Sequence, residues 1–84
     1  MMILWSVNAW EDYLYWQSKD KKTLKRVNIL IKDIMRNPFS GLGEPEALRH
    51  SWSGYFSRRI DREHRLVYTF KDNTIIIAQC RYHY

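Results

Sequence analysis

The sequence has a single cysteine, Cys80, among its 84 residues, so no disulfide can form within the chain. Small secreted folds usually depend on disulfides, and their absence favours a reducing compartment and a fold held by packing alone. Only three glycines and two prolines are present, which leaves little room for linkers. We therefore expect one domain, spanning residues 1–84, with a single compact core.

Long hydrophobic runs are also missing. The apolar N-terminal run MMILW ends after five residues at the polar Ser6. A transmembrane helix needs about 20 apolar residues, and a secretory signal needs a longer apolar region than this one. We therefore expect no membrane segment and a cytoplasmic location.

Acidic side chains are fewer than basic ones, with 9 against 14, which gives a formal net charge of +5. This excess favours an anionic partner, either a nucleic acid, an anionic membrane or an acidic protein, although charge also serves solubility. Aromatic residues make up 15% of the chain and hydrophobic residues 45%. That content is enough for a folded core and excludes a disordered chain.

The N-terminal half has helical patterns after a short strand. Residues 1–5 suit a buried strand, and Ser6 or Asn8 can cap a first helix that runs to about Gln17. Asn8 stands three residues before Glu11, a spacing that resembles a capping box.

A second, longer helix follows, with Asp20 as its cap and Asn37-Pro38 as its end, because proline cannot continue the hydrogen-bond ladder. Its apolar residues recur every three or four positions, which predicts a buried face and a solvated one. The predicted buried face carries Leu24, Val27, Ile31, Ile34 and Met35. The predicted solvated face carries Lys21, Lys22, Lys25, Lys32 and Asp33.

Beyond a Pro- and Gly-rich loop at residues 38–45, the pattern changes to strands. We predict strands at 55–60, 64–70 and 74–80, joined by short polar turns, with a further short strand at 48–50. The fold class is therefore α+β, with two N-terminal helices packed on one face of a mainly antiparallel sheet. The other face is left open and can hold a site.

Lysine and arginine are distributed unevenly. Five of six lysines lie in the helical half, where they form a solvated face, and six of eight arginines lie in the sheet half. The planar guanidinium binds phosphate with two parallel hydrogen bonds, so an arginine-rich sheet suggests phosphate recognition. The alternative is that some of these arginines form structural ion pairs with Glu44, Asp61 or Glu63, and it applies above all to Arg58 and Arg62, which lie beside or within a turn.

Alternation along the strand after His64 sorts its side chains onto two faces. Leu66, Tyr68 and Phe70 share the more apolar face, which we expect to be the core side. Arg65 then points to the open face of the sheet.

RNA cleavage without a metal requires a base, an acid and a cation that stabilises charge on the phosphate. The sequence offers Glu46 in the loop, Arg65 on a strand and His83 in the C-terminal segment. Their spacing alone does not separate a nuclease from a plain RNA- or ribosome-binding module, so both remain open.

A metal site is not expected, because His50, His64, Cys80 and His83 lack any paired-ligand spacing, and no cofactor is expected either. We predict that His50 and His64 are surface or strand-edge residues and that Cys80 packs in the core. We expect Tyr82 to close the edge of the core and Tyr84 to be free to stack on a base.

The chain resembles the YoeB/Txe toxins of bacterial toxin–antitoxin pairs, within the RelE superfamily. The resemblance covers essentially all of the chain. It is carried by the segments WEDYLYW, GLGEPEALRH, GYFSRRI and EHRLVY and by the ending CRYHY. It implies a microbial-ribonuclease-like α/β fold and ribosome-dependent cleavage of mRNA in the A site.

The same resemblance implies a role for each matching residue. Glu46 is the general base, His83 the general acid, Arg65 stabilises the scissile phosphate, and Tyr84 orients the phosphate or stacks on a base. Arg49 stands where relatives often have lysine, and Ala47 replaces a common proline. Two further phosphate- or RNA-binding side chains are implied, Arg49 and Arg59.

The resemblance also implies partners. We expect mRNA on the 70S ribosome as the target, a YefM-like antitoxin with a disordered acidic segment, and a homodimer. A non-enzymatic toxin on the same fold, like the gyrase-poisoning ParE proteins, is the alternative, since fold alone does not fix function.

Overall fold

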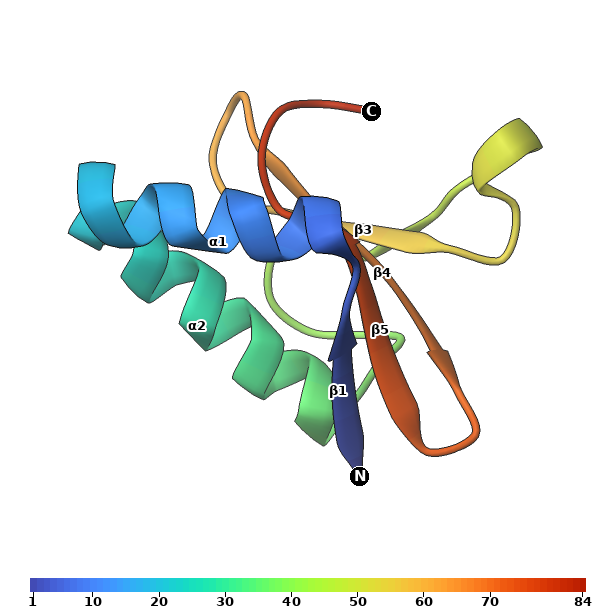
Figure 1. Cartoon of the computed structure of the whole chain (residues 1–84). Coiled ribbons are helices and arrows are strands. Elements are labelled where there is room, and N and C mark those ends of the chain that lie inside the picture. The colour runs from blue at the N-terminus through green and yellow to red at the C-terminus, as the bar shows by residue number, and fades with distance from the viewer.

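The computed structural model describes residues 1–84 as two helices on a five-stranded sheet (Figure 1). The sheet order is β1-β5-β4-β3-β2, with β1 parallel to β5 and the other neighbours antiparallel. A short 3₁₀ helix, His50–Trp52, follows β2. The elements are β1 (Met2–Trp5), α1 (Val7–Lys19), α2 (Lys21–Arg36), β2 (Glu46–Ala47), β3 (Phe56–Arg59), β4 (Arg65–Lys71) and β5 (Thr74–Gln79).

Both helices lie on the same face of the sheet, as predicted (Figure 1). Their buried residues pack against the inward side chains of β4 and β5 in one cluster, so the α+β layout is confirmed. We call the opposite side of the sheet the open face. The inner cluster includes Ala9, Trp16, Val27, Leu30, Ile31, Ile34, Leu66, Tyr68, Ile75 and Ile77.

The helix starts follow side-chain caps. The hydroxyl of Ser6 accepts a hydrogen bond from the backbone N–H of Ala9, so Ser6 is the cap of α1. The predicted capping box between Asn8 and Glu11 was wrong, because the Asn8 side-chain amide donates to the Asp12 carboxylate instead. Asp20 caps α2, as predicted.

The first strand exists but is not buried, contrary to the prediction. Met2 is 68% exposed and Leu4 is 55% exposed. The reason is position: β1 is an edge strand whose only neighbour is β5. The apolar run at residues 1–5 therefore predicted the strand correctly and its burial incorrectly.

The short additional strand was predicted two residues too late. It forms at Glu46–Ala47, and the backbone N–H of Leu48 still donates to the carbonyl of Tyr55. His50 cannot continue the ladder, because its φ of 57° starts a 3₁₀ helix. The shift matters because it places Glu46 within the sheet rather than in a loop.

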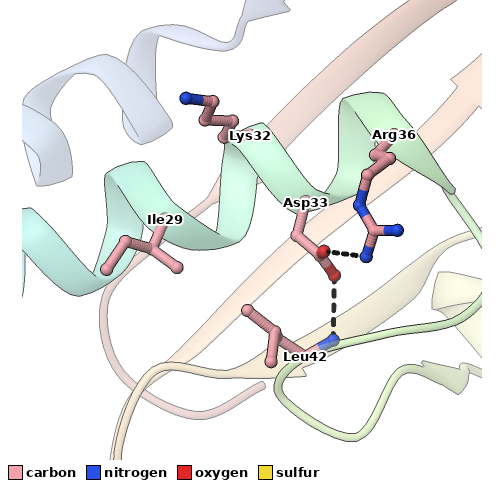
Figure 2. A pocket seen from close by; sticks show the side chains of 5 residues that line it. All are labelled: Ile29, Lys32, Asp33, Arg36 and Leu42. Atoms are coloured by element: carbon pink, nitrogen blue, oxygen red, sulfur yellow. Dashed lines mark hydrogen bonds and ion pairs between the residues drawn. The ribbon is translucent and has the colours of Figure 1, made fainter.

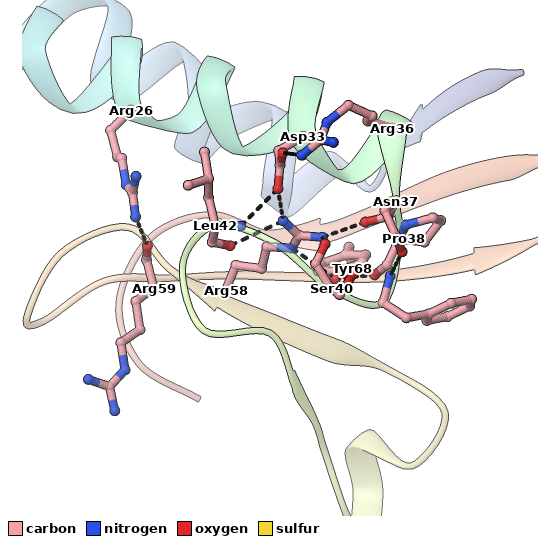
Figure 3. Close-up of polar contacts among 11 residues, drawn as sticks. Arg26, Asp33, Arg36, Asn37, Pro38, Ser40, Leu42, Arg58, Arg59 and Tyr68 are labelled. Carbon is pink, nitrogen blue, oxygen red and sulfur yellow. Dashed lines mark hydrogen bonds and ion pairs between the residues drawn. The ribbon is translucent and has the colours of Figure 1, made fainter.

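The buried face of α2 differs from the prediction at three positions. Leu30 is fully buried, Met35 is 42% exposed, and Asp33, predicted on the solvated face, is only 7% exposed. Asp33 is buried because the guanidinium of Arg58 lies against it, with Nη1 2.6 Å from the carboxylate (Figure 3). Arg58 is itself fully buried. The structural alternative for Arg58 is therefore confirmed, although its partner is not one of the three acids named for it.

The Arg58 guanidinium also fastens the loop that leads to β2. Its nitrogens donate to five acceptors drawn from α2, β4 and this loop, as Figure 3 shows: the Asp33 carboxylate, the Tyr68 hydroxyl and the carbonyls of Asn37, Ser40 and Leu42. At Gly43, with φ of 80°, an added Cβ would lie 3.1 Å from the Arg58 Cβ and 3.0 Å from Leu30. The loop is therefore packed tightly enough to fix where β2 begins.

Asp33 accepts three sets of donors, which hold the pKa of its carboxyl well below the usual range. The Arg36 guanidinium contributes most, followed by the backbone N–H of Leu42 and by Arg58. Figure 2 shows the first two of these bonds in the shallow hollow between α2 and the loop. The charged form is thus the one that the fold stabilises.

We expect acid to weaken this clamp. Because the folded pKa of Asp33 is depressed, its contribution to stability is complete above the unfolded value of about 3.9 and is lost progressively as the pH falls below it. Urea unfolding from pH 7 to pH 2 should therefore show a steep loss below about pH 4. Asp33→Asn should flatten that acid limb, whereas Asp72→Asn, in an exposed turn, should not. An unchanged slope in Asp33→Asn would contradict the role of the carboxylate.

No helix of the chain is both long enough and apolar enough to cross a bilayer.

Candidate functional site

The sheet register brings several of the predicted site residues onto the open face. Glu46 pairs with Ser57, and Ser57 pairs with Val67, so these three form one row across β2, β3 and β4. Arg59 pairs with Arg65 in the next row. Directly paired residues project to the same side of a sheet, and the intervening Arg58 points to the helices. The prediction that Arg65 faces away from the core is confirmed.

The two rows form a compact platform. Adjacent strands lie about 4.8 Å apart and each residue rises about 3.4 Å along a strand, so the backbones of Glu46 and Arg65, two strands and two residues apart, are about 12 Å apart. Val67 is fully buried but is not part of the helix-side cluster, so this part of the open face is covered.

The C-terminal segment, residues 80–84, lies over this row. The hydroxyl of Tyr84 is 3.2 Å from Oγ of Ser57, at the middle of the row. Tyr84 and residues 46–52 line an open hollow, which we call the 46–52 hollow. The fold thereby brings together Glu46, Arg49 and Tyr84, which are far apart in the sequence.

The polar groups of the platform have spare capacity for a ligand. Nη1 of Arg65 donates to the carbonyls of Asp61 and His64, while its Nε and Nη2 have no partner in the chain. Glu46 and Arg49 are exposed and make no side-chain hydrogen bond or ion pair. Arg65 is therefore pinned in place and still presents the donors that a phosphate would use.

Arg59 is less free than Arg49. Its Nη1 lies 3.3 Å from the carboxylate of Glu44, and both side chains are largely exposed. A pair of this kind is worth little in water and can exchange for a phosphate contact. Its backbone N–H donates to the carbonyl of Gly43, which joins the loop to β3.

His83 lies outside the 46–52 hollow. Its exposed ring stacks on Tyr84, with centroids 4.6 Å apart, and Nδ1 is 3.0 Å from the backbone oxygen of Tyr84. That oxygen can only accept, so Nδ1 is the donor in this contact, and Nε2 has no partner in the chain. No hydrogen bond or ion pair joins Glu46, Arg65 and His83 to one another, and the three surround the platform from different elements.

The root of the C-terminal segment is anchored to α1. The backbone N–H of Cys80 donates to the Asp12 carboxylate, and Nε1 of Trp16 donates to the Cys80 carbonyl at 2.8 Å. Burial raises the pKa of Asp12, against the lowering effect of the Cys80 N–H. Cys80 is fully buried, as predicted, and burial raises the pKa of its thiol to about 12, so it is an unreactive core residue at neutral pH.

The prediction for Tyr82 was wrong. Tyr82 is 54% exposed instead of closing the core, and its φ of 66° turns the chain back over the sheet. The backbone of Tyr82 is held by the start of β4: its N–H donates to Nδ1 of His64, and its carbonyl accepts from the N–H of Arg65.

Two residues that shape the site, Ser57 and His64, were not predicted to belong to it. Ser57 and Arg59 are two residues apart in β3, so their side chains lie on the same face of the sheet. Alternation along the segment FSRR could therefore have placed Ser57 on the open face. His64 was predicted to be an edge residue, and its contact with Tyr82 joins positions 18 residues apart that no local pattern connects. No three His, Cys, Asp or Glu side chains gather closely enough to form a metal-binding group.

Comparison with known proteins gives consistent matches over the full chain. A family model described as the YoeB-like toxin of bacterial type II toxin–antitoxin systems matches residues 5–84. Toxin YoeB of Escherichia coli (strain K12) is 56% identical over 84 residues, which are 100% of each chain. The solved YoeB/ParE toxin from Agrobacterium tumefaciens is 42% identical, with a TM-score of 0.98 over 100% of both chains.

YoeB from Staphylococcus aureus is similar in two further structures, each 53% identical and each covering 100% of this chain and 98% of that chain. One is a YoeB dimer, with a TM-score of 0.93, and the other is a heterotetrameric YoeB–YefM toxin–antitoxin complex, with a TM-score of 0.92. The resemblance found in the sequence and the RelE-like fold that it implied are both confirmed. The chain belongs to the YoeB-like toxins of bacterial type II toxin–antitoxin systems.

Proposed function

We propose that this toxin is a metal-independent, ribosome-dependent endoribonuclease that cuts mRNA in the ribosomal A site and so stops translation. The observation that supports it best is the platform on the open face. There the register gathers Glu46, Arg59 and Arg65 around Ser57, and Tyr84 lies over them. A carboxylate, two guanidinium groups and an aromatic ring on one surface suit a phosphodiester and its base.

The proposed reaction is an attack by the 2′-hydroxyl on the adjacent phosphorus. Glu46 takes the 2′-hydroxyl proton as the 2′-oxygen bonds to phosphorus, and His83 protonates the 5′-oxygen as its bond to phosphorus breaks. The products are a 2′,3′-cyclic phosphate and a 5′-hydroxyl. Each proton transfer contributes about 10²–10⁴-fold to the rate when the group is well placed. Arg65, through Nε and Nη2, stabilises the charge that develops on the phosphate.

Tyr84, Arg49 and Arg59 hold the RNA. The Tyr84 ring borders the 46–52 hollow and can stack on a base, while its hydroxyl is oriented by Ser57. Arg49 in the hollow and Arg59 on the platform contact neighbouring phosphates. Each contact adds affinity without reading sequence, as backbone contacts generally do.

Dependence on the ribosome follows from how open this site is. Glu46, Arg65 and His83 make no hydrogen bond or ion pair with one another, and Glu46 and His83 are exposed. A free RNA would have to be held with the 2′-oxygen, phosphorus and 5′-oxygen in line by the toxin alone. The ribosome already fixes the mRNA, and such orientation lowers the barrier substantially. We expect weak cleavage of free RNA.

The proposed partners follow from the relatives and from charge. The S. aureus relative is solved with YefM and as a dimer. We propose that a YefM-like antitoxin with an acidic segment neutralises this basic chain, that the toxin forms a homodimer, and that it acts in the bacterial cytoplasm. Residues 1–84 would then act as a single toxin domain.

The test is cleavage of mRNA on programmed ribosomes by the native chain, His83→Ala and a chain lacking Tyr84. We expect cutting within the A-site codon by the native chain and a loss of about 10²–10⁴-fold in His83→Ala. Loss of Tyr84 should cost about 10–100-fold, the equivalent of one stacking contact. Ribosome affinity, measured by co-sedimentation, should be unchanged in His83→Ala.

A native chain that binds ribosomes and leaves mRNA intact would instead support an RNA-binding module. One that ignores ribosomes and inhibits another target would support a non-enzymatic toxin.

A further inference from the structure

The C-terminal segment reaches the platform only through a turn at Tyr82. Its φ of 66° lies in the left-handed region, which costs a non-glycine residue free energy and persists only when other contacts fix it. The turn carries Tyr84 to Ser57 and sets His83 beside it. Whatever holds the Tyr82 peptide therefore holds the end of the chain.

Two consecutive residues at the start of β4 hold that peptide. The Tyr82 N–H donates to Nδ1 of His64 at 2.7 Å, and the Arg65 N–H donates to the Tyr82 carbonyl at 2.9 Å. The second bond is between backbone groups and does not depend on side-chain identity. The first depends on an unprotonated nitrogen of one side chain, His64.

The His64 ring is itself fixed in place. Its side chain is only 13% exposed and packs edge-on against Trp16, with centroids 4.8 Å apart. Trp16 in turn donates to the carbonyl of Cys80 at the root of the segment. His64 thus joins α1, β4 and the C-terminal segment at one point.

The geometry sets the protonation state of the ring. Nδ1 accepts a hydrogen bond from the Tyr82 N–H, so Nδ1 itself carries no proton and the ring is neutral. The ring proton is then on Nε2, which faces the Glu63 carboxylate at 3.6 Å. A doubly protonated ring would set an N–H against the N–H of Tyr82. Protonation therefore removes the bond and replaces it with a repulsion between donors.

Charged groups of both signs surround the ring. The acidic neighbours are Asp61 and Glu63 in the adjoining turn and Asp12 on α1. The basic groups are Arg65, which follows His64 in β4, and Arg81, which lies in the C-terminal segment above the Tyr15 ring. The Tyr82 N–H faces Nδ1 of the ring in the docked segment.

We infer that His64 is a positioning residue that docks the C-terminal segment when its ring is neutral and releases it when the ring is protonated. The inference deepens the proposed function, on which its catalytic part rests, because it makes the placement of His83 and Tyr84 depend on a second histidine that never touches RNA. Docking and catalysis are separable in experiment, since the Tyr82 amide reports docking without any substrate.

The first measurement uses the native chain. NMR spectra recorded between about pH 5 and pH 8, the range in which histidine charge changes, should follow the His64 ring and the Tyr82 amide together. As His64 is protonated, we expect the Tyr82 amide signal to shift. We also expect the Tyr82 amide to lose protection, so that its hydrogen-exchange rate comes closer to the intrinsic rate at each pH. A Tyr82 amide that is indifferent to the His64 titration would overturn the inference.

The matched variants are His64→Asn and His64→Leu. Asparagine places its Oδ1 acceptor where Nδ1 stood and does not titrate, whereas leucine fills a similar volume with no acceptor. In His64→Leu the Tyr82 amide should exchange about fivefold faster, as expected for one hydrogen bond. In His64→Asn it should stay protected, and the dependence on pH should disappear. Equal protection in both variants would contradict the role of Nδ1.

Cleavage on ribosomes gives the second readout. We expect His64→Leu to lower kcat about fivefold with little change in KM. We expect kcat of the native chain to fall as His64 is protonated, and His64→Asn to keep kcat and remove that part of the fall. If no variant cleaves mRNA and the Tyr82 amide behaves as described, the proposed function fails while the docking role stands. If cleavage is normal and docking is unchanged in His64→Leu, the docking role fails alone.

Discussion

Replacing Glu46 with glutamine is expected to slow mRNA cleavage on programmed ribosomes by about 10²–10⁴-fold. Glutamine keeps the size of the side chain and its place beside Ser57 but cannot take the 2′-hydroxyl proton. Glu46 is exposed and makes no side-chain bond, so the change removes a base without disturbing the fold. Single-turnover cleavage at saturating ribosome concentration isolates the chemical step.

The control for that substitution is Glu11→Gln, which makes the same chemical change at an exposed position of α1. Its cleavage rate should equal that of the native chain. Ribosome affinity should be the same in all three proteins, since neither glutamate binds the phosphate. A Glu46→Gln chain that cleaves at the native rate would mean that another group takes the proton.

Replacing Arg58 with methionine is expected to destabilise the fold by about 3–5 kcal/mol, the range for breaking a buried ion pair on one side. Arg58 is fully buried, and its loss leaves the acceptors on Asn37, Ser40 and Leu42 without a donor. A small domain has roughly 5–15 kcal/mol of stability in total, so this change should rank among the most damaging in the chain. Urea unfolding monitored by tryptophan fluorescence measures it.

Two comparisons define the origin of the effect. Arg62→Met, in the exposed turn between β3 and β4, should change the free energy of unfolding by less than about 0.5 kcal/mol. Arg58→Lys keeps the charge but cannot reach five acceptors, so it should fall between the native chain and Arg58→Met. An Arg58→Met chain as stable as the native one would show that the buried pair merely balances its own desolvation.

The sequence predicted the elements better than it predicted their burial. The helical span of α2, its Asp20 cap and its end at Asn37 before the proline follow from local signals, and each was confirmed. Asp33 was wrongly predicted to be solvated, because its partner, Arg58, lies 25 residues away on β3. The burial of a charged group depends on a partner brought there by the fold, which periodicity does not contain. The exposure of β1 was missed for a related reason, since strand order decides which strand is the edge.

For the site, the sequence and the family resemblance supplied the residues, and the register supplied their arrangement. Alternation alone placed Arg65 on the open face, and the structure confirms it. The position of Glu46 beside Ser57 required the pairing of β2 with β3, which the predicted strand had two residues too late. The contact of His64 with Tyr82 depends on where the chain turns after β5, and no sequence pattern indicates that turn. The catalytic roles themselves remain predictions.

The most direct test of the proposed nuclease is the chemistry of the ends that it leaves. mRNA from programmed ribosomes treated with the native chain should be cut within the A-site codon and analysed by mass spectrometry of the new termini. Attack by the 2′-hydroxyl predicts a 2′,3′-cyclic phosphate, or the phosphate formed when it opens, together with a 5′-hydroxyl. Intact mRNA, or fragments with a 3′-hydroxyl and a 5′-phosphate, would contradict acid–base cleavage by Glu46 and His83.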